Sequence, residues 1–147
     1  MLIWNHSKQC INSLLPMKIH SLRLSPGNDL KHSLDSYASD KKLDAAAIVT
    51  CVGSLTVATI RFAGKEQTDS VPGPLEITSL TGTFSKDGSH FHITVTDQDG
   101  KASGGHLKEG SIVRTTAEIV ILEPEDVYYL REQDPQTGYK ELKIVPK

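Results

Sequence analysis

The stretch SHFHITVTDQDGKASGGHL, residues 89–107, predicts two antiparallel strands joined by a turn. Side chains alternate between the two faces of a strand, so Phe91, Ile93 and Val95 share one face and form a core surface. Residues 97–100, DQDG, tolerate turn geometry and left-handed backbone angles. The chain is therefore expected to reverse there and to return beside the first strand.

Three of the chain's six histidines lie in this stretch. His90 and His92 are two residues apart on the predicted strand, so both point to the face opposite the core surface. The returning strand is expected to bring His106 close to both of them. Gly104 and Gly105 have no side chains, which lets a ligand, an ion or another backbone approach. The sequence therefore predicts that His90, His92 and His106 form one metal site.

Zinc is the ion that these side chains fit best, with another transition metal as the alternative. Imidazole is a good zinc ligand, and three protein nitrogens leave a fourth position for water or substrate. Water bound at that position becomes a nucleophile near neutral pH. The His-X-His pattern alone carries little information, so solvent-facing residues and hydrogen-bonding groups of a subunit interface stay open as alternatives. The third ligand is equally open to His20 or to a neighbouring subunit.

The preceding segment is expected to pair with the histidine strand. Residues 75–84 form a predicted strand, and residues 86–88, KDG, form the turn between the two strands. Glu76 is a carboxylate in this otherwise apolar or hydroxyl-bearing strand. It is a candidate catalytic residue, for proton transfer or for support of a metal ligand, and the alternative is a strand-edge charge in water.

The remaining chain predicts one helix and further strands. Leu30, Leu34 and Tyr37 recur at helical spacing after a cap at Asn28 or Asp29. Further strands are expected at residues 17–24, 44–62 and 112–122 and in a final hairpin at 127–145, with a loop at 63–73.

Residues 44–62 are the most apolar segment and are rich in β-branched side chains. Apolar residues on both alternating faces predict a central strand that is covered on two sides. Gly53 and Ser54 mark a bend, a bulge or a reversal within it. The whole pattern predicts an α+β, sandwich-like fold, a mostly antiparallel β-sheet with one main helix packed on it.

The length of 147 residues fits one domain with a sizeable core. Residues 1–16 have no clean period and are expected to form an N-terminal extension, with a single domain over 17–147 that includes the final hairpin. The net charge of −2 disfavours direct nucleic-acid binding. No apolar run is long enough to span a bilayer, so no membrane association is expected.

The cysteines and the N-terminus indicate an intracellular protein. Cys10 and Cys51 allow at most one bridge, and Cys51 lies in an apolar stretch where a buried free thiol is expected. The N-terminus lacks the apolar core of a signal peptide, so export is not expected. The expected location is the cytoplasm, with the nucleus as the alternative.

Five ordered motifs run through the chain: RLSPGNDL at 23–30, VGSL at 52–55, EITSLTG at 76–82, His92 followed by DQDG at 97–100, and GGHL at 104–107. In this order they resemble the PPC domain, also called the domain of unknown function 296. The resemblance covers residues 17–122. The tail at 134–139, DPQTGY, is similar to the segment that follows the domain in some stand-alone members.

The resemblance implies a PPC-like fold assembled as a homotrimer, with a metal ion held by histidines in some prokaryotic members. His92 and His106 fall within the motifs, which favours them as ligands. In plant members the domain follows AT-hook motifs that grip the DNA minor groove. This sequence has no Arg-Gly-Arg-Pro core and no basic cluster, so it is similar to the stand-alone members.

The sequence leaves three functions to compare. The first is a homotrimeric PPC-domain protein with a histidine zinc site and an unassigned biochemical activity. The second is a non-catalytic trimeric module that binds protein partners near residues 73–84, by analogy with the partner-binding region of the plant proteins. The third is nucleic-acid binding through a local patch. The sequence contains no nucleophile-and-base pair, phosphate loop or dinucleotide fingerprint, so it leaves open whether the protein is an enzyme.

Overall fold

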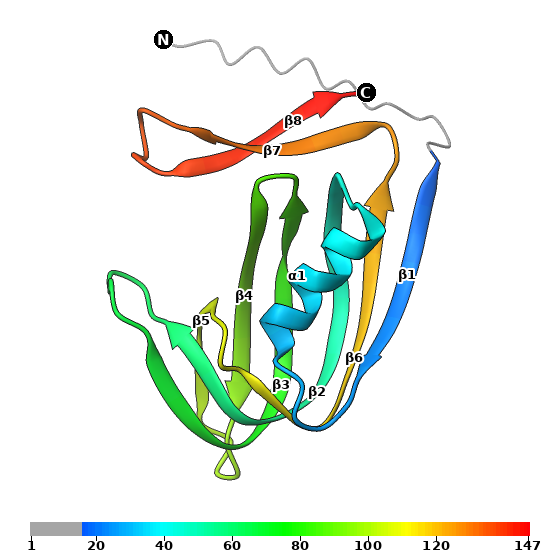
Figure 1. Ribbon diagram of the computed structural model, residues 1–147. Helices are drawn as coiled ribbons and strands as arrows, with labels where there is room; N and C mark the ends of the chain where they lie inside the picture. Colours follow the sequence, from blue (N-terminus) through cyan, green and yellow to red (C-terminus); the bar gives the residue numbers. More distant parts are fainter. Residues whose placement is uncertain (1–15) are drawn as a thin grey trace, which may run out of the picture.

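The computed structural model describes residues 16–147, and their main element is a six-stranded antiparallel sheet with the strand order β1-β6-β2-β3-β4-β5. The edge strand β5 also pairs with β2, so the sheet curls back on itself (Figure 1). The predicted fold class, a mostly antiparallel sheet with one helix, is confirmed. The strands of this sheet are β1 (Met17–Leu24), β2 (Ala45–Arg61), β3 (Asp69–Ser85), β4 (Gly88–Thr96), β5 (Ala102–Leu107) and β6 (Ile112–Pro124).

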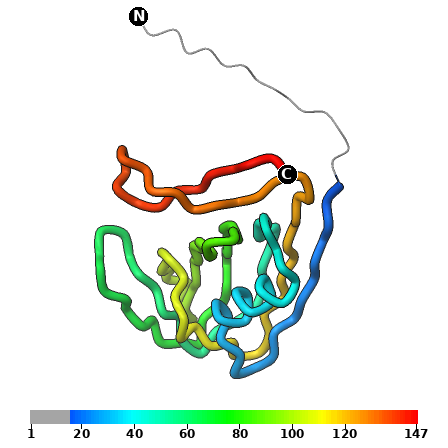
Figure 2. The backbone as a smooth tube through the Cα atoms, turned by 45° about the horizontal axis from the view of Figure 1, so that its top comes forward, coloured from blue at the N-terminus to red at the C-terminus, as the bar shows by residue number. Residues whose placement is uncertain are grey.

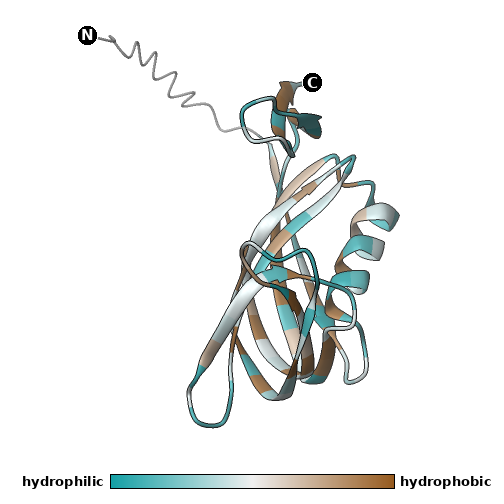
Figure 3. Cartoon of the chain, turned by 90° about the vertical axis from the view of Figure 1, so that its left-hand side faces the viewer, coloured by the Kyte–Doolittle hydropathy of each residue, from teal (hydrophilic) through white to brown (hydrophobic). Residues whose placement is uncertain are grey.

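The helix α1 (Leu30–Lys41) forms where the apolar spacing predicts it. It buries Leu30 and Leu34 against the sheet, and Lys42, in a left-handed conformation, ends it. The side view in Figure 3 shows the helix on one side of the sheet. The exposed His32 lies on the helix away from the buried stripe.

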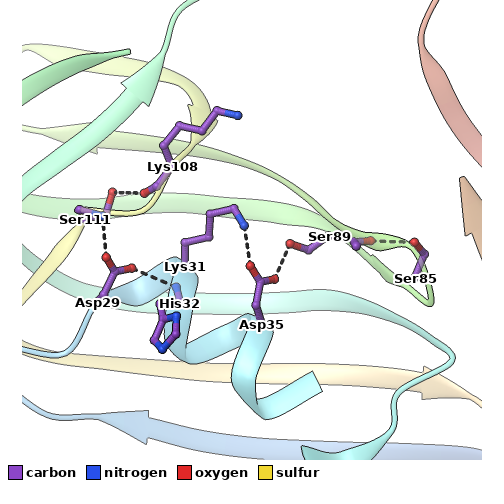
Figure 4. Close-up of polar contacts among 10 residues, drawn as sticks. Asp29, Lys31, His32, Asp35, Ser85, Ser89, Lys108 and Ser111 are labelled. Atoms are coloured by element: carbon purple, nitrogen blue, oxygen red, sulfur yellow. Dashed lines mark hydrogen bonds and ion pairs between the residues drawn. The ribbon is translucent and has the colours of Figure 1, made fainter. Parts of the chain in front are cut away.

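Asp29 caps the helix and also ties it to the sheet. One carboxylate oxygen accepts a hydrogen bond from the His32 backbone N–H at 3.0 Å (Figure 4). The other accepts one from Gly110 N–H at 2.5 Å. Gly110 belongs to the turn before β6, so a single side chain fixes the start of the helix against the sheet. Of the two predicted caps, the structure selects Asp29.

We expect Asp29→Ala to lower the free energy of unfolding by about 1–2 kcal/mol, because it removes a helix cap and leaves a turn amide without its acceptor. Urea denaturation measures the change. Asp40→Ala is the matched control, since Asp40 is exposed near the other end of the same helix. Equal effects of the two substitutions would contradict the capping role.

The core lies between α1 and the concave face of the sheet. In β4, the predicted alternation is confirmed, because Phe91, Ile93 and Val95 are buried and the residues between them are not. Phe91 packs edge to face on Phe84 of the neighbouring strand, with ring centroids 4.9 Å apart. The hairpin of β3 and β4 thus forms as predicted.

The predicted loop at residues 63–73 is shorter than expected. The strand β3 already begins at Asp69 and runs through the Pro72-Gly73-Pro74 sequence at the end of the predicted loop. The register with β2 shifts there, between Leu55 and Val57, and such an irregularity accommodates prolines that cannot donate to the ladder. A side chain at Gly73 would meet the backbone oxygens of β2 at 2.6 and 2.7 Å, so only glycine allows this approach.

Residues 45–61 form a single strand, with an irregular register around Gly53 and not a reversal. As predicted, this strand is central in the sheet, but the residues that the structure describes cover only one of its faces. On the other face Met17 and Ile19 of β1 and Val49 and Val52 of β2 are between 54% and 71% exposed. We call these four residues the outer apolar face.

The predicted C-terminal hairpin is formed by β7 (Val127–Gln133) and β8 (Lys140–Pro146). It lies across one end of the large sheet (Figures 1 and 2). Tyr129 joins it to the sheet, since its carbonyl accepts from Lys86 N–H at 3.0 Å and its N–H donates to the Asp44 carbonyl at 3.1 Å. This position is the reason that the hairpin also borders the histidine strand.

Two sequence-based expectations concern other properties of the chain. Within residues 16–147 no helix is long and apolar enough to cross a membrane. Cys51 is buried as expected, and burial raises the pKa of its thiol to about 12. Cys10 and nearly all of the predicted N-terminal extension lie outside the described residues.

Candidate metal centre

The three histidines of the sequence motif come together on two neighbouring strands. His90 and His92 extend from the same face of β4, and His106 on β5 is the direct cross-strand partner of His92. Side chains of directly opposed residues in an antiparallel pair lie about 5 Å apart at Cβ. Strand alternation and register therefore place all three imidazoles side by side, as the sequence predicts.

One imidazole nitrogen from each of these residues lies within 4.8 Å of the others. His90 Nε2 and His106 Nδ1 are 3.2 Å apart, and their rings stack at an interplanar angle of 7°. In tetrahedral zinc sites two ligand nitrogens are about 3.4 Å apart, given a Zn–N bond of about 2.0–2.1 Å. The imidazoles are partly exposed, which leaves an open side for a further ligand. The residues present thus fit a transition-metal ion.

The surroundings favour the neutral form of two imidazoles. Desolvation, followed by the positive charge of Arg61, lowers the pKa of His106 to about 4. Desolvation, followed by the charge of Arg131, also lowers the pKa of His90. Metal ligation requires neutral imidazole, so protons compete little for these two side chains at neutral pH.

The two glycines before His106 serve the packing of the backbone. A Cβ at Gly105 would lie 2.6 Å from the Arg61 carbonyl oxygen, and one at Gly104 would lie 2.9 Å from the Ile93 carbonyl oxygen. Of the partners that the sequence leaves open for this pair, the structure provides another backbone. The glycines let β5 fit between β2 and β4, which fixes the position of His106.

A pocket beside the histidines contains residues that sequence reasoning missed. It has a volume of about 310 Å³, and Arg131, Glu141 and Leu142 of the C-terminal hairpin line it together with His90 and His92. No local pattern marks these residues, because they lie about 40 to 50 positions after the histidine strand. Only the docking of the hairpin brings them to the site.

Two other candidates lie elsewhere. Glu76 is exposed and pairs with Thr96, four residues along β4 from His92, a separation of about 13 Å along a strand. His20 is on β1, where it hydrogen-bonds to Tyr37 and Glu123 at 3.0 Å each. The structure thus brings neither residue to the three imidazoles of the same chain.

The fold and this cluster define the class of protein, a small antiparallel-sheet domain with one helix and three imidazoles on adjacent strands. The chain belongs to the family of the Plants and Prokaryotes Conserved domain, whose model matches residues 12–125. This match confirms the family resemblance seen in the sequence. The matched region includes the three histidines and ends before the C-terminal hairpin.

Solved structures share this fold. A hypothetical protein from Salmonella enterica is 38% identical, with a TM-score of 0.88, and the match covers 92% of this chain and 98% of that one. A metal-containing protein from Archaeoglobus fulgidus is 28% identical, with a TM-score of 0.74 and coverage of 89% and 99%. A plant- and prokaryote-conserved protein from Pyrococcus horikoshii, 21% identical with a TM-score of 0.76 and coverage of 91% and 97%, shows the shared fold.

Curated relatives contain the domain as a part of longer chains. The bifunctional protein GlmU of one Synechococcus strain is 43% identical over 130 residues, which is 88% of this chain and 21% of that protein. The same protein of a second strain is 41% identical over 128 residues, 87% and 21% of the two chains. The chain thus spans about a fifth of the length of these relatives.

Proposed function

We propose that this protein is a homotrimer in which His90, His92 and His106 of each subunit bind one transition-metal ion, with zinc as the best fit. The observation that carries the proposal is the convergence of three potential ligand atoms within 4.8 Å of one another. The relative from Archaeoglobus fulgidus that is described as metal-containing adds support. The biochemical activity of the site stays unassigned.

The chemistry of the ligands favours zinc over harder cations. Three nitrogen ligands suit zinc, copper, nickel or iron, whereas magnesium and calcium prefer oxygen ligands. A bound zinc ion with an open position supplies a Lewis acid and a water of lowered pKa. The protein's own part is to hold three imidazoles in fixed orientation on two paired strands.

The test is the metal content of tag-free protein purified without added metal, measured by plasma mass spectrometry. We expect close to one zinc or other transition-metal ion per subunit. Protein that contains no metal and takes up none from a zinc solution would contradict the proposal. That result would favour the alternative of a non-catalytic interaction module.

The trimer has support from the surface of the subunit. The outer apolar face exposes Met17 and Ile19 on β1 and Val49 and Val52 on β2, the two strands that flank β6. Monomeric proteins rarely expose a large apolar patch. Burial of these side chains against further copies of the chain would remove them from water. The family resemblance favours three copies.

We expect Val52→Asp to convert the trimer into monomers, because a carboxylate in an apolar interface loses its hydration. Light scattering coupled to size-exclusion chromatography measures the mass. The matched control is Ile144→Asp, since Ile144 is exposed to a similar extent, 57% against 54% for Val52, but lies on β8. A trimer that survives Val52→Asp would exclude the outer apolar face as its interface.

A further inference from the structure

Two arginines flank the three imidazoles. Arg131 of β7 lines the same pocket as His90 and His92. Arg61 of β2 is the cross-strand partner of His106. The guanidinium groups therefore come from two different strands that border the candidate metal centre.

Arg131 is held in place by groups of the histidine hairpin. Its Nη2 donates to Thr83 Oγ1 at 2.8 Å, and Thr83 is the cross-strand partner of His90. Its backbone N–H donates to the Asp87 carboxylate at 2.9 Å. Among residues 16–147 no carboxylate forms an ion pair with this guanidinium. Most of the five donors of the side chain are therefore free for a ligand.

The charge around the imidazoles is positive. Arg131 and the carboxylate Glu141 line the pocket, and Arg61 is the cross-strand partner of His106. A divalent metal ion would add two further positive charges. Glu141 offsets only one of them, so the loaded site would attract anions.

We infer that the metal-loaded pocket binds a small oxyanion, a carboxylate or a phosphate group, with Arg131 as its forked hydrogen-bonding partner. Guanidinium matches the geometry of both groups through two parallel N–H donors. The pocket volume of about 310 Å³ suits a small molecule. This inference rests on the proposed metal site and specifies the class of ligand that it takes.

The test uses the full chain loaded with cobalt(II), whose visible spectrum responds to a change in coordination. The protein is titrated with inorganic phosphate and, separately, with acetate, with sodium chloride as the ionic-strength control. We expect a saturable spectral change with at least one oxyanion and none with chloride at equal ionic strength. Tighter binding of phosphate would identify the ligand as a phosphate compound, and tighter binding of acetate would identify it as a carboxylate compound.

Substitutions then assign the anion partner. We expect Arg131→Ala to raise the dissociation constant of the oxyanion by about tenfold or more, since a charge-assisted hydrogen bond is lost. Arg131→Lys keeps the positive charge but lacks the two parallel N–H donors. Its dissociation constant for the oxyanion should lie between those of the wild type and Arg131→Ala. Arg114→Ala, at an exposed arginine on β6, is the control and should match the wild type.

The outcomes separate this inference from the proposed function. Bound cobalt at wild-type stoichiometry in both Arg131 variants, with weakened oxyanion binding, supports the inference. Cobalt uptake without a response to either oxyanion overturns the inference and leaves the metal site standing, as does unchanged oxyanion affinity in Arg131→Ala. Failure of the wild type to bind cobalt overturns both.

Discussion

Alanine in place of His92 or His106 is expected to lower the metal content from about one ion per subunit to less than about a tenth of that value. The candidate site has three imidazoles, so either substitution leaves only two of them. The two residues are direct cross-strand partners. Removal of a group that merely orients a metal ligand already costs about 10- to 100-fold in affinity, and loss of the ligand itself should cost more. Plasma mass spectrometry of the purified variants measures the content.

The control for this experiment is His32→Ala. His32 is an exposed histidine on α1, outside the cluster of three, so its loss should leave the metal content unchanged. The oligomeric state is measured for all variants, because a change in assembly could itself change the metal content. Full metal content in both the His92 and the His106 variant would exclude these residues as ligands.

Gly82→Ala is expected to destabilise the fold by more than about 3 kcal/mol, or to prevent folding. Gly82 has φ at +146° and lies opposite Phe91 in the pairing of β3 with β4. A Cβ would lie 2.0 Å from the His90 carbonyl oxygen and 2.8 Å from Phe91 Cα, and both are backbone atoms that no side-chain rotation relieves. The strand that carries two histidines would have to move away. Denaturant titration at one fixed protein concentration measures the loss.

Gly138→Ala is the control that lacks the steric part of this effect. Gly138 also has a positive φ, +74°, but nothing lies within 4 Å of the Cβ that alanine would add. Its substitution should therefore cost only the backbone strain, about 1 kcal/mol. If the two variants lost the same stability, close contact with β4 would not be the reason for glycine at position 82.

The fold could be predicted wherever periodicity and turn chemistry agree. The alternation of Phe91, Ile93 and Val95 between polar residues defines a half-buried strand, and the DQDG turn places the next strand beside it. The helix follows from the spacing of Leu30 and Leu34 behind a capping carboxylate. These signals are local, so one sequence suffices to read them.

The errors arose where tertiary contacts override local preference. Pro72-Gly73-Pro74 has the composition of a turn, but the partner strand β2 holds it in extended form. Residues 45–61 are apolar on both faces, yet the described chain covers only one of them. An apolar strand face indicates burial but does not indicate which surface covers it. A contact between subunits produces the same pattern of apolar residues as a core within one subunit.

For the site, the sequence predicted the three imidazoles and missed their neighbours. His90, His92 and His106 meet because a turn of four residues returns the chain in register, which is a local event. Arg131 and Glu141 arrive with a hairpin whose docking depends on contacts at Lys86 and Asp44. Tertiary docking of this kind produces no periodic pattern of residues in the sequence.

The C-terminal hairpin lies beyond residue 125, where the family match ends, and yet it forms one wall of the histidine pocket. In the proposed function, the three metal ligands and the anion-binding Arg131 therefore lie in two separate segments of the chain. A chimaera that keeps the three histidines but carries the corresponding hairpin of a relative in place of residues 127–146 should retain its metal. Its anion preference should change. Under this proposal, the domain would hold the metal and the C-terminal hairpin would set the anion preference.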